Sequence, residues 1–141
     1  MKLEKIKNAF KEILSKEKNI IATYLYGSAS YSEFYEDIDI DIGLLIDEGF
    51  KPNYMYEVKL AGKLEKRFKD TIGIYKSIDV RVLNEKPLRF LHSVLKNSIL
   101  IYSVDDFKRV QFEARIMKEY LDFKPHFEFY EKMRRYRYAN R

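Results

Sequence analysis

The sequence contains no cysteine, so it has neither a disulfide framework nor a thiolate metal site. It also lacks a long hydrophobic run, since no stretch approaches the roughly 20 apolar residues that a membrane-spanning helix requires. Residues 1–7 mix apolar and charged side chains as an amphipathic helix does, and no apolar core of a signal peptide follows them. These absences together predict a cytoplasmic protein.

Histidine is scarce as well, and the net charge is small. The 2 histidines, His92 and His126, have no partner at metal-ligand spacing, and neither looks catalytic. The net charge of +5 is a modest excess, which suits an anionic ligand such as a nucleotide or an acidic partner. It is not concentrated enough to make nucleic-acid binding the leading interpretation. The 141 residues suggest one domain with a real core.

The hydrophobic pattern alternates between helical and strand periods, which predicts an α/β fold, or α+β in stricter terms: a small mixed sheet backed by helices. Helices are expected over about 2–16, 29–35 and 55–68, from 87, and from 105 or 106. Strands are expected over 20–26, 38–46, 78–82 and 98–102. We expect residues 1–103 to form the core and residues 104–141 a C-terminal helical extension of the same domain.

Two of these helices have an apolar stripe that the pattern defines in detail. In the helix over 55–68 the stripe is Met55, Val58, Ala61, Leu64 and Phe68, with Glu57, Lys59, Lys63, Glu65 and Lys66 on the wet side. In the last helix the apolar positions are Phe107, Val110, Ala114, Met117 and Leu121. Pro125 is expected to bend or end this helix. The basic and aromatic tail, 133–141, is either a solvated end or a dock for an acidic partner or RNA.

Aspartates alternate with isoleucines in the second strand, although the run otherwise has the pattern of a buried strand. Its period of two places Asp37, Asp39 and Asp41 on one face, and Asp79 belongs to the strand over 78–82. Charges rarely enter such a run unless they are paired or bind a metal. If the strands pair, Asp39, Asp41 and Asp79 form an oxygen-rich cluster suited to Mg²⁺, and a pair of such ions can clamp a phosphoryl displacement.

Simpler interpretations of these residues remain open. The second strand could be a solvated edge with its acidic residues outward. Arg81 shares a face with Asp79, and it could pair with an aspartate or touch a phosphate.

The pair Gly27 and Ser28 lies between the first strand and the expected short helix. Glycine lets a phosphate approach the backbone closely, and a helix N-terminus offers unpaired N–H groups. The serine hydroxyl adds one more donor. Such a turn would face the same nucleotide triphosphate as the carboxylates, although a simple turn is the alternative for these two residues taken alone.

At this point the chain resembles a known family. Gly27-Ser28, followed by Asp39-Ile40-Asp41 and the apolar run 42–46, resembles the signature of the DNA polymerase β-like nucleotidyltransferase superfamily. The small size is similar to its minimal nucleotidyltransferase branch, and the strand of Asp79 takes the place of that branch's third carboxylate. The segments 87–90, 99–102 and 120–123 are also similar to the MntA antitoxins, which pair with HEPN-domain toxins (HepT).

The resemblance, which covers most of the chain, implies a function. Proteins of this kind transfer AMP from ATP to a tyrosine hydroxyl of the cognate HEPN ribonuclease, which blocks RNA cleavage. It implies that Asp39, Asp41 and Asp79 are the catalytic and metal-binding residues, with two Mg²⁺ ions, and that Gly27 and Ser28 bind the nucleotide.

One departure from the family pattern keeps alternatives open. Tyr31 and Ser32 stand where the family usually has a second glycine, and this could narrow the phosphate pocket. An antitoxin that acts by binding alone, with a degenerate site, is therefore one alternative. A small-molecule nucleotidyltransferase, such as an aminoglycoside-modifying enzyme, is another. Asp37 is either a spare ligand or a solvated strand end.

Overall fold

The computed structural model describes residues 2–27 and 39–139. Ser28, Asp37, the departure at Tyr31 and Ser32, and the helix expected over 29–35 all lie outside these residues. The described elements follow the chain in the order α1 (Lys2–Leu14), β1 (Ile20–Tyr26), β2 (Ile40–Ile46), α2 (Tyr56–Ile72), β3 (Ile78–Val82), α3 (Leu88–Lys96), β4 (Ile99–Ser103) and α4 (Asp106–Ala139).

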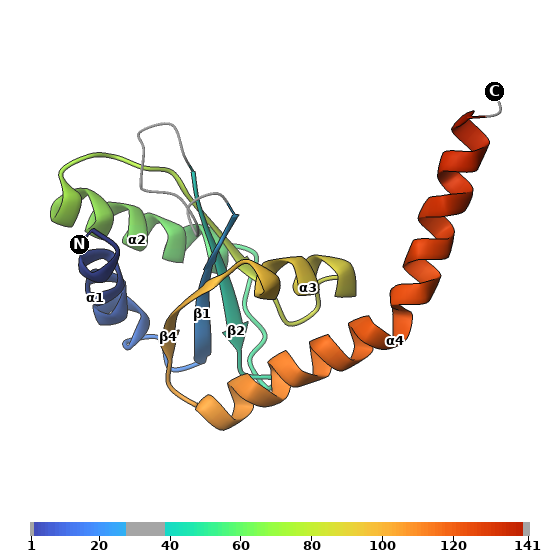
Figure 1. The fold of residues 1–141 in the computed structure, drawn as a ribbon. Helices are drawn as coiled ribbons and strands as arrows, with labels where there is room; N and C mark the ends of the chain where they lie inside the picture. The colour runs from blue at the N-terminus through green and yellow to red at the C-terminus, as the bar shows by residue number, and fades with distance from the viewer. Residues whose placement is uncertain (1, 28–38, 140–141) are drawn as a thin grey trace.

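The strands within the described residues form one mixed sheet with the order β3-β2-β1-β4 (Figure 1). Strand β1 runs antiparallel to both of its neighbours, β2 and β4. Strands β2 and β3 are parallel, and α2 forms the crossover between them. The predicted α+β fold is therefore confirmed, and so is the pairing of the two aspartate-bearing strands.

Each face of the sheet is covered by a pair of helices (Figure 1). Helices α1 and α2 bury Phe10, Leu64 and Phe68 against the isoleucines of β2, and these residues belong to one core cluster. Helix α3 and the first part of α4 bury Leu91 and Phe112 on the opposite face, in a second cluster. Burial of side chains this large stabilises the fold by roughly 1.5–3 kcal/mol each, so the strands that carry the candidate site are held from both sides.

Helix α2 does more than cover the sheet, because two of its carboxylates bind the backbone of β3. Glu57 Oε2 accepts a hydrogen bond of 2.6 Å from the amide of Val82, and Glu65 Oε1 accepts one of 3.1 Å from the amide of Ile78. The expectation that Glu57 and Glu65 belong to the solvated face of the helix is therefore wrong. Both residues lie on the rim of that face, within reach of the sheet edge.

The apolar stripe predicted for α2 also needs a correction. Val58 is 62% exposed, whereas Leu60, which the predicted stripe leaves out, is buried with Leu64 and Phe68. The helix is rotated about its axis so that the row at positions 60, 64 and 68 faces the core. This rotation is the one that brings Glu57 and Glu65 to β3.

Helix α4 begins as predicted, but the face that it buries against the sheet is not the predicted one. The side chain of Asp105 accepts a hydrogen bond of 3.0 Å from the amide of Lys108, as an N-cap does. The apolar positions that predicted the helix face solvent, with Phe107 72% and Leu121 62% exposed. The residues that α4 buries against the sheet are Phe112 and Ile116.

The second part of α4 leaves the body of the molecule. Pro125 lies inside the helix, where a proline removes a backbone hydrogen bond and kinks the axis. Figure 1 shows the helix bent, with its C-terminal half pointing away from the sheet. No helix within residues 2–27 and 39–139 has both the length and the apolar character needed to cross a membrane.

Candidate active site

The register of the sheet brings the predicted carboxylates together. Asp41 on β2 is the direct partner of Asp79 on the parallel strand β3. On its other side Asp41 is the partner of Tyr26, the last residue of β1. Asp39 is exposed just before β2 begins. Because side chains alternate along a strand, Asp39 and Asp41 share a face, and the pairing of Asp41 with Asp79 extends this acidic group across two strands.

Gly27 follows the last residue of β1 and lies against the carboxylate of Asp41. Its φ of +74° lies in the left-handed region, which favours glycine. A Cβ at this position would lie 2.5 Å from Asp41 Oδ2, which is too close for any side chain. The missing side chain therefore lets the Asp41 carboxylate pack directly against the end of β1.

The pKa of Asp41, the central member of this acidic group, is raised. Burial contributes most to the raised pKa of Asp41, and the negative charges of Asp79 and Asp39 add to it, whereas Arg81 opposes it. Tyr26 responds to the same field, because burial and then Asp41 raise the pKa of its hydroxyl to about 12. A carboxylate whose pKa is raised by neighbouring negative charges lies in a field that attracts a cation.

Arg81 is the cation that the structure places beside these acids. Its Nε donates a hydrogen bond of 3.0 Å to Asp79 Oδ2. Its guanidinium lies 5.9 Å from the ring centre of Phe90 on α3, and the Phe90 ring packs edge-on against Tyr26. Of the two roles that the sequence left open for Arg81, pairing with an aspartate is the one observed.

The residues present fit a divalent metal ion by their chemistry, although they are not gathered around one. Within residues 2–27 and 39–139, no three histidine, cysteine, aspartate or glutamate side chains converge closely enough to hold a metal ion. Asp79 is turned to Arg81 instead. The donor set of Asp39, Asp41 and Asp79 is nevertheless all carboxylate oxygen, which Mg²⁺ prefers, and Gly27 lies against the carboxylate of Asp41.

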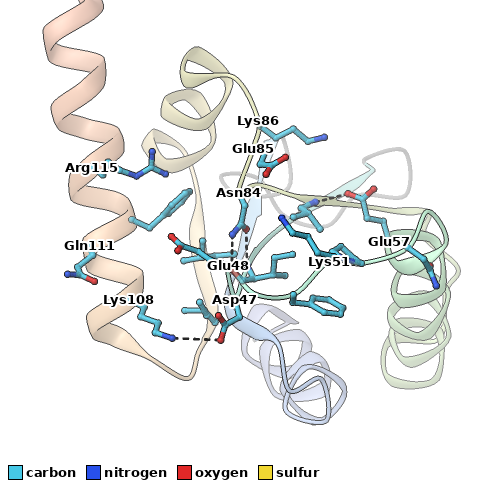
Figure 2. Close-up of a pocket in the computed structure, with 18 of the residues that line it drawn as sticks. Asp47, Glu48, Lys51, Glu57, Asn84, Glu85, Lys86, Lys108, Gln111 and Arg115 are labelled. Atoms are coloured by element: carbon cyan, nitrogen blue, oxygen red, sulfur yellow. Dashed lines mark hydrogen bonds and ion pairs between the residues drawn. The ribbon is translucent and has the colours of Figure 1, made fainter.

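The large cleft of the molecule lies elsewhere, at the opposite end of β2 and β3 (Figure 2). It has a volume of about 1130 Å³ and is bounded by the loop after β2, the loop after β3 and the first part of α4. Charges of both signs line it. Lys108 of α4 reaches Asp47 across it at 3.7 Å.

Polar groups in this cleft are bonded to one another or to the backbone. The amide of Asn84 donates a hydrogen bond of 2.7 Å to the carbonyl of Ile46, and its oxygen accepts one of 3.0 Å from the amide of the same residue. Asn84 therefore continues the sheet beyond its last strand pair. This cleft therefore lies apart from Asp41 and Asp79, at the end of the strand pair that Asn84 supports.

Sequence reasoning missed two residues at the carboxylate end. Tyr26 precedes the glycine signal directly, so its place opposite Asp41 follows once β1 and β2 are paired. Phe90 belongs to the segment 87–90 that resembles the MntA antitoxins, but its contact with Tyr26 could not be predicted because it depends on how α3 crosses the sheet.

The fold is a small mixed sheet, and two of its neighbouring strands carry carboxylates beside Gly27. This combination of fold and site is typical of nucleotidyltransferases. A family model described as "Polymerase beta, Nucleotidyltransferase" matches residues 8–107. The chain belongs to this nucleotidyltransferase family. The match spans all four described strands, including the two that carry Asp41 and Asp79. The comparison with curated proteins finds no significant match.

Solved toxin–antitoxin structures share the fold. A chain of a toxin–antitoxin crystallised with AMP-PNP superposes with a TM-score of 0.66 and 17% identity, over 85% of this chain and 90% of that one. A chain from the complex of tri-AMPylated Shewanella oneidensis HEPN toxin with MNT antitoxin gives 0.63 and 17%, over 89% and 92%. A chain of the toxin–antitoxin MntA-HepT gives 0.62 and 16%, over 86% and 89%. The chain thus shares the fold of these proteins.

Proposed function

We propose that this chain transfers AMP from ATP to a tyrosine hydroxyl of a HEPN-domain toxin and so acts as its antitoxin. Membership of the family supplies the reaction class. Relatives of like fold support the rest, since one was crystallised with AMP-PNP and another belongs to a complex with a tri-AMPylated HEPN toxin. In this chain, the observation that carries the proposal is the pairing of Asp41 with Asp79 beside Gly27.

The residues of the site have distinct parts in this reaction. Asp39, Asp41 and Asp79 would hold magnesium, which when bound neutralises phosphate charge and lowers the pKa of an attacking hydroxyl. Gly27, which has no side chain, would let the phosphates approach the backbone at the end of β1. The tyrosine oxygen bonds to the α-phosphorus while the bond from that phosphorus to the pyrophosphate oxygen breaks. The phenolic proton passes to solvent through the carboxylates, and positioning supplies most of the catalysis.

The test uses the purified chain, ATP, Mg²⁺ and a purified HEPN-domain protein. Intact-mass measurement should show AMP added to that protein, and peptide mapping should place it on tyrosine. Asp79→Asn should lower the rate by about a hundredfold or more, because a preorganised charge is lost where charge develops.

Asp47→Asn is the matched control. Asp47 and Asp79 are exposed to nearly the same extent, 49% and 48%, and each forms one ion pair with a basic residue. Asp47 lies at the other end of the strand pair, so its loss should leave the rate within about twofold, as expected of a surface ion pair. Equal effects of the two substitutions, or no AMP on the partner with the unaltered chain, would contradict the proposal.

An antitoxin that acts by binding alone is the second candidate. The exposed apolar side chains of α4, among them Phe107 and Leu121, favour it, because a partner could cover them without any chemistry. Growth of cells that express the toxin separates the two candidates. Rescue that survives Asp41→Asn and Asp79→Asn favours binding alone, whereas rescue that is lost while the complex still forms favours transfer.

A further inference from the structure

Arg81 occupies the place from which a cation would contact Asp79. Its guanidinium takes Asp79 Oδ2 at 3.0 Å, and Asp79 is the register partner of Asp41. Arg81 lies close enough to Asp41 to oppose the rise in that carboxylate's pKa. A carboxylate oxygen that accepts a hydrogen bond from a guanidinium cannot also bind a metal ion well, because both claim the same lone pairs and the two positive charges repel.

The ion pair is also easily broken. Both side chains are about half exposed, at 50% and 48%, and an exposed pair of this kind contributes little to stability. Packing near Phe90 guides the guanidinium but does not enclose it. A cavity of about 550 Å³ runs along β3 and is lined by both Asp79 and Arg81. Arg81 therefore has room to leave Asp79 without rearrangement of the core.

We propose that Arg81 is a positioning residue that competes with the divalent cation for Asp79 and, once displaced, contacts the phosphates of the nucleotide. The proposal rests on the nucleotide site of the proposed function. When the cation and the nucleotide bind, the ion pair between Arg81 and Asp79 would be replaced by two interactions. Asp79 would then contact the cation, and Arg81 would contact a phosphate. A guanidinium suits the second, since its planar donors match two phosphate oxygens at once.

This competition predicts opposite effects on two ligands. Without Arg81, Asp79 is unpaired, so Mn²⁺ alone, followed by the electron paramagnetic resonance signal of the free ion, should bind Arg81→Gln roughly two- to fivefold more tightly. A fluorescent ATP analogue in the presence of Mn²⁺ should bind the same variant about tenfold more weakly, because a charge-assisted contact is lost. A merely structural Arg81 would not move the two affinities in opposite directions.

Three further variants locate the effect. Arg81→Lys keeps the charge but not the planar fork, so its Mn²⁺ affinity should stay near that of the unaltered chain while ATP binding weakens. In an Asp79→Asn background, Arg81→Gln should no longer tighten Mn²⁺ binding. Arg115→Gln is the matched control, since Arg115 forms an exposed ion pair with Glu119 away from the site, and it should change neither affinity.

Unchanged or weaker Mn²⁺ binding by Arg81→Gln overturns the inference, and so does tightening that persists in the Asp79→Asn background. Failure of the proposed function shows differently. If AMP never appears on the HEPN-domain protein while the two affinities still move in opposite directions, the acceptor is wrong and the role of Arg81 stands. If neither the unaltered chain nor Arg81→Gln binds Mn²⁺, with or without the ATP analogue, both fail.

Discussion

The two ends of the parallel strand pair β2 and β3 carry similar residues with opposite consequences. Each end has an aspartate paired with a basic residue, Asp79 with Arg81 and Asp47 with Lys108, at nearly equal exposure. At the Asp47 end the charge pairs with α4 and the backbone is bonded to Asn84. At the Asp79 end three carboxylates outnumber one arginine, and burial together with the charges of Asp79 and Asp39 raises the pKa of Asp41. Unbalanced charge, and not the size of the hollow, distinguishes the candidate site.

The largest expected effect comes from Asp41, at the carboxylate end. Asp41→Asn should lower the rate of AMP transfer by about a hundredfold or more, since the central oxygen donor of the cluster is lost. The rate is measured with ATP and the HEPN-domain protein. A retained rate would remove the functional contrast between the two ends.

Gly27 tests the shape of the same end. Gly27→Ala places a Cβ 2.5 Å from Asp41 Oδ2 and imposes the left-handed region on a residue that disfavours it, at a cost of about 1–2 kcal/mol. We expect a lower free energy of unfolding in urea and a loss of transfer. Gly49→Ala, where a Cβ meets nothing within 4 Å, is the control and should change neither. Equal behaviour of the two variants would refute the close approach to Asp41.

Asn84 tests the structural end. Asn84→Ala removes both hydrogen bonds to the backbone of Ile46, so the free energy of unfolding should fall by about 1–3 kcal/mol. The rate of transfer, measured well below the melting temperature, should be retained. A variant that keeps its stability but loses transfer would reverse the roles assigned to the two ends.

The pH dependence of stability gives a finer contrast. Because the pKa of Asp41 is raised in the folded protein, folding is favoured when Asp41 is protonated, and this contribution is lost as the pH rises through that pKa. Asp41→Asn should therefore raise the melting temperature at neutral pH, with a gain that shrinks toward about pH 4, near the ordinary value of the group. Melting curves across this range test it. A destabilised variant at neutral pH would show that the carboxylate is not strained.

The smallest effect is expected for Lys108. Lys108→Gln breaks the ion pair with Asp47 and should lower the free energy of unfolding by at most about 1 kcal/mol. Added salt should reduce the difference between the two proteins. A larger loss that is insensitive to salt would mean that α4 is fastened here by more than an exposed ion pair.

Much of this arrangement follows from the sequence, because strand periodicity is strict. The period of two placed Asp39 and Asp41 on one face, and the room for one helix between the second and third strands made their pairing plausible, while the parallel register that sets Asp79 beside Asp41 comes from the structure. The sequence could not decide between a phosphate and an aspartate as the partner of Arg81, since both lie on the same face.

The wrong predictions concern which face of a helix is buried, because the sequence of a helix can contain more than one row of apolar residues. In α2 the rows containing Val58 and Leu60 are equally plausible, and only the packed sheet selects Leu60. In α4 the regular row that includes Phe107 and Leu121 is the better pattern, yet Phe112 and Ile116 are the residues that meet the sheet. Periodicity shows that a helix is amphipathic, but the contacts made by its neighbours decide which side is inside.

The two glutamates of α2 have a consequence for the solubility of the molecule. Strand β3 is terminal in the order of the described strands, and amides at such an edge commonly recruit a strand from another chain. Glu57 and Glu65 already accept hydrogen bonds from the amides of Val82 and Ile78, so a foreign strand would have to displace both carboxylates to pair there. Helix α2 thus covers part of this edge, which disfavours pairing of β3 with another copy of the chain.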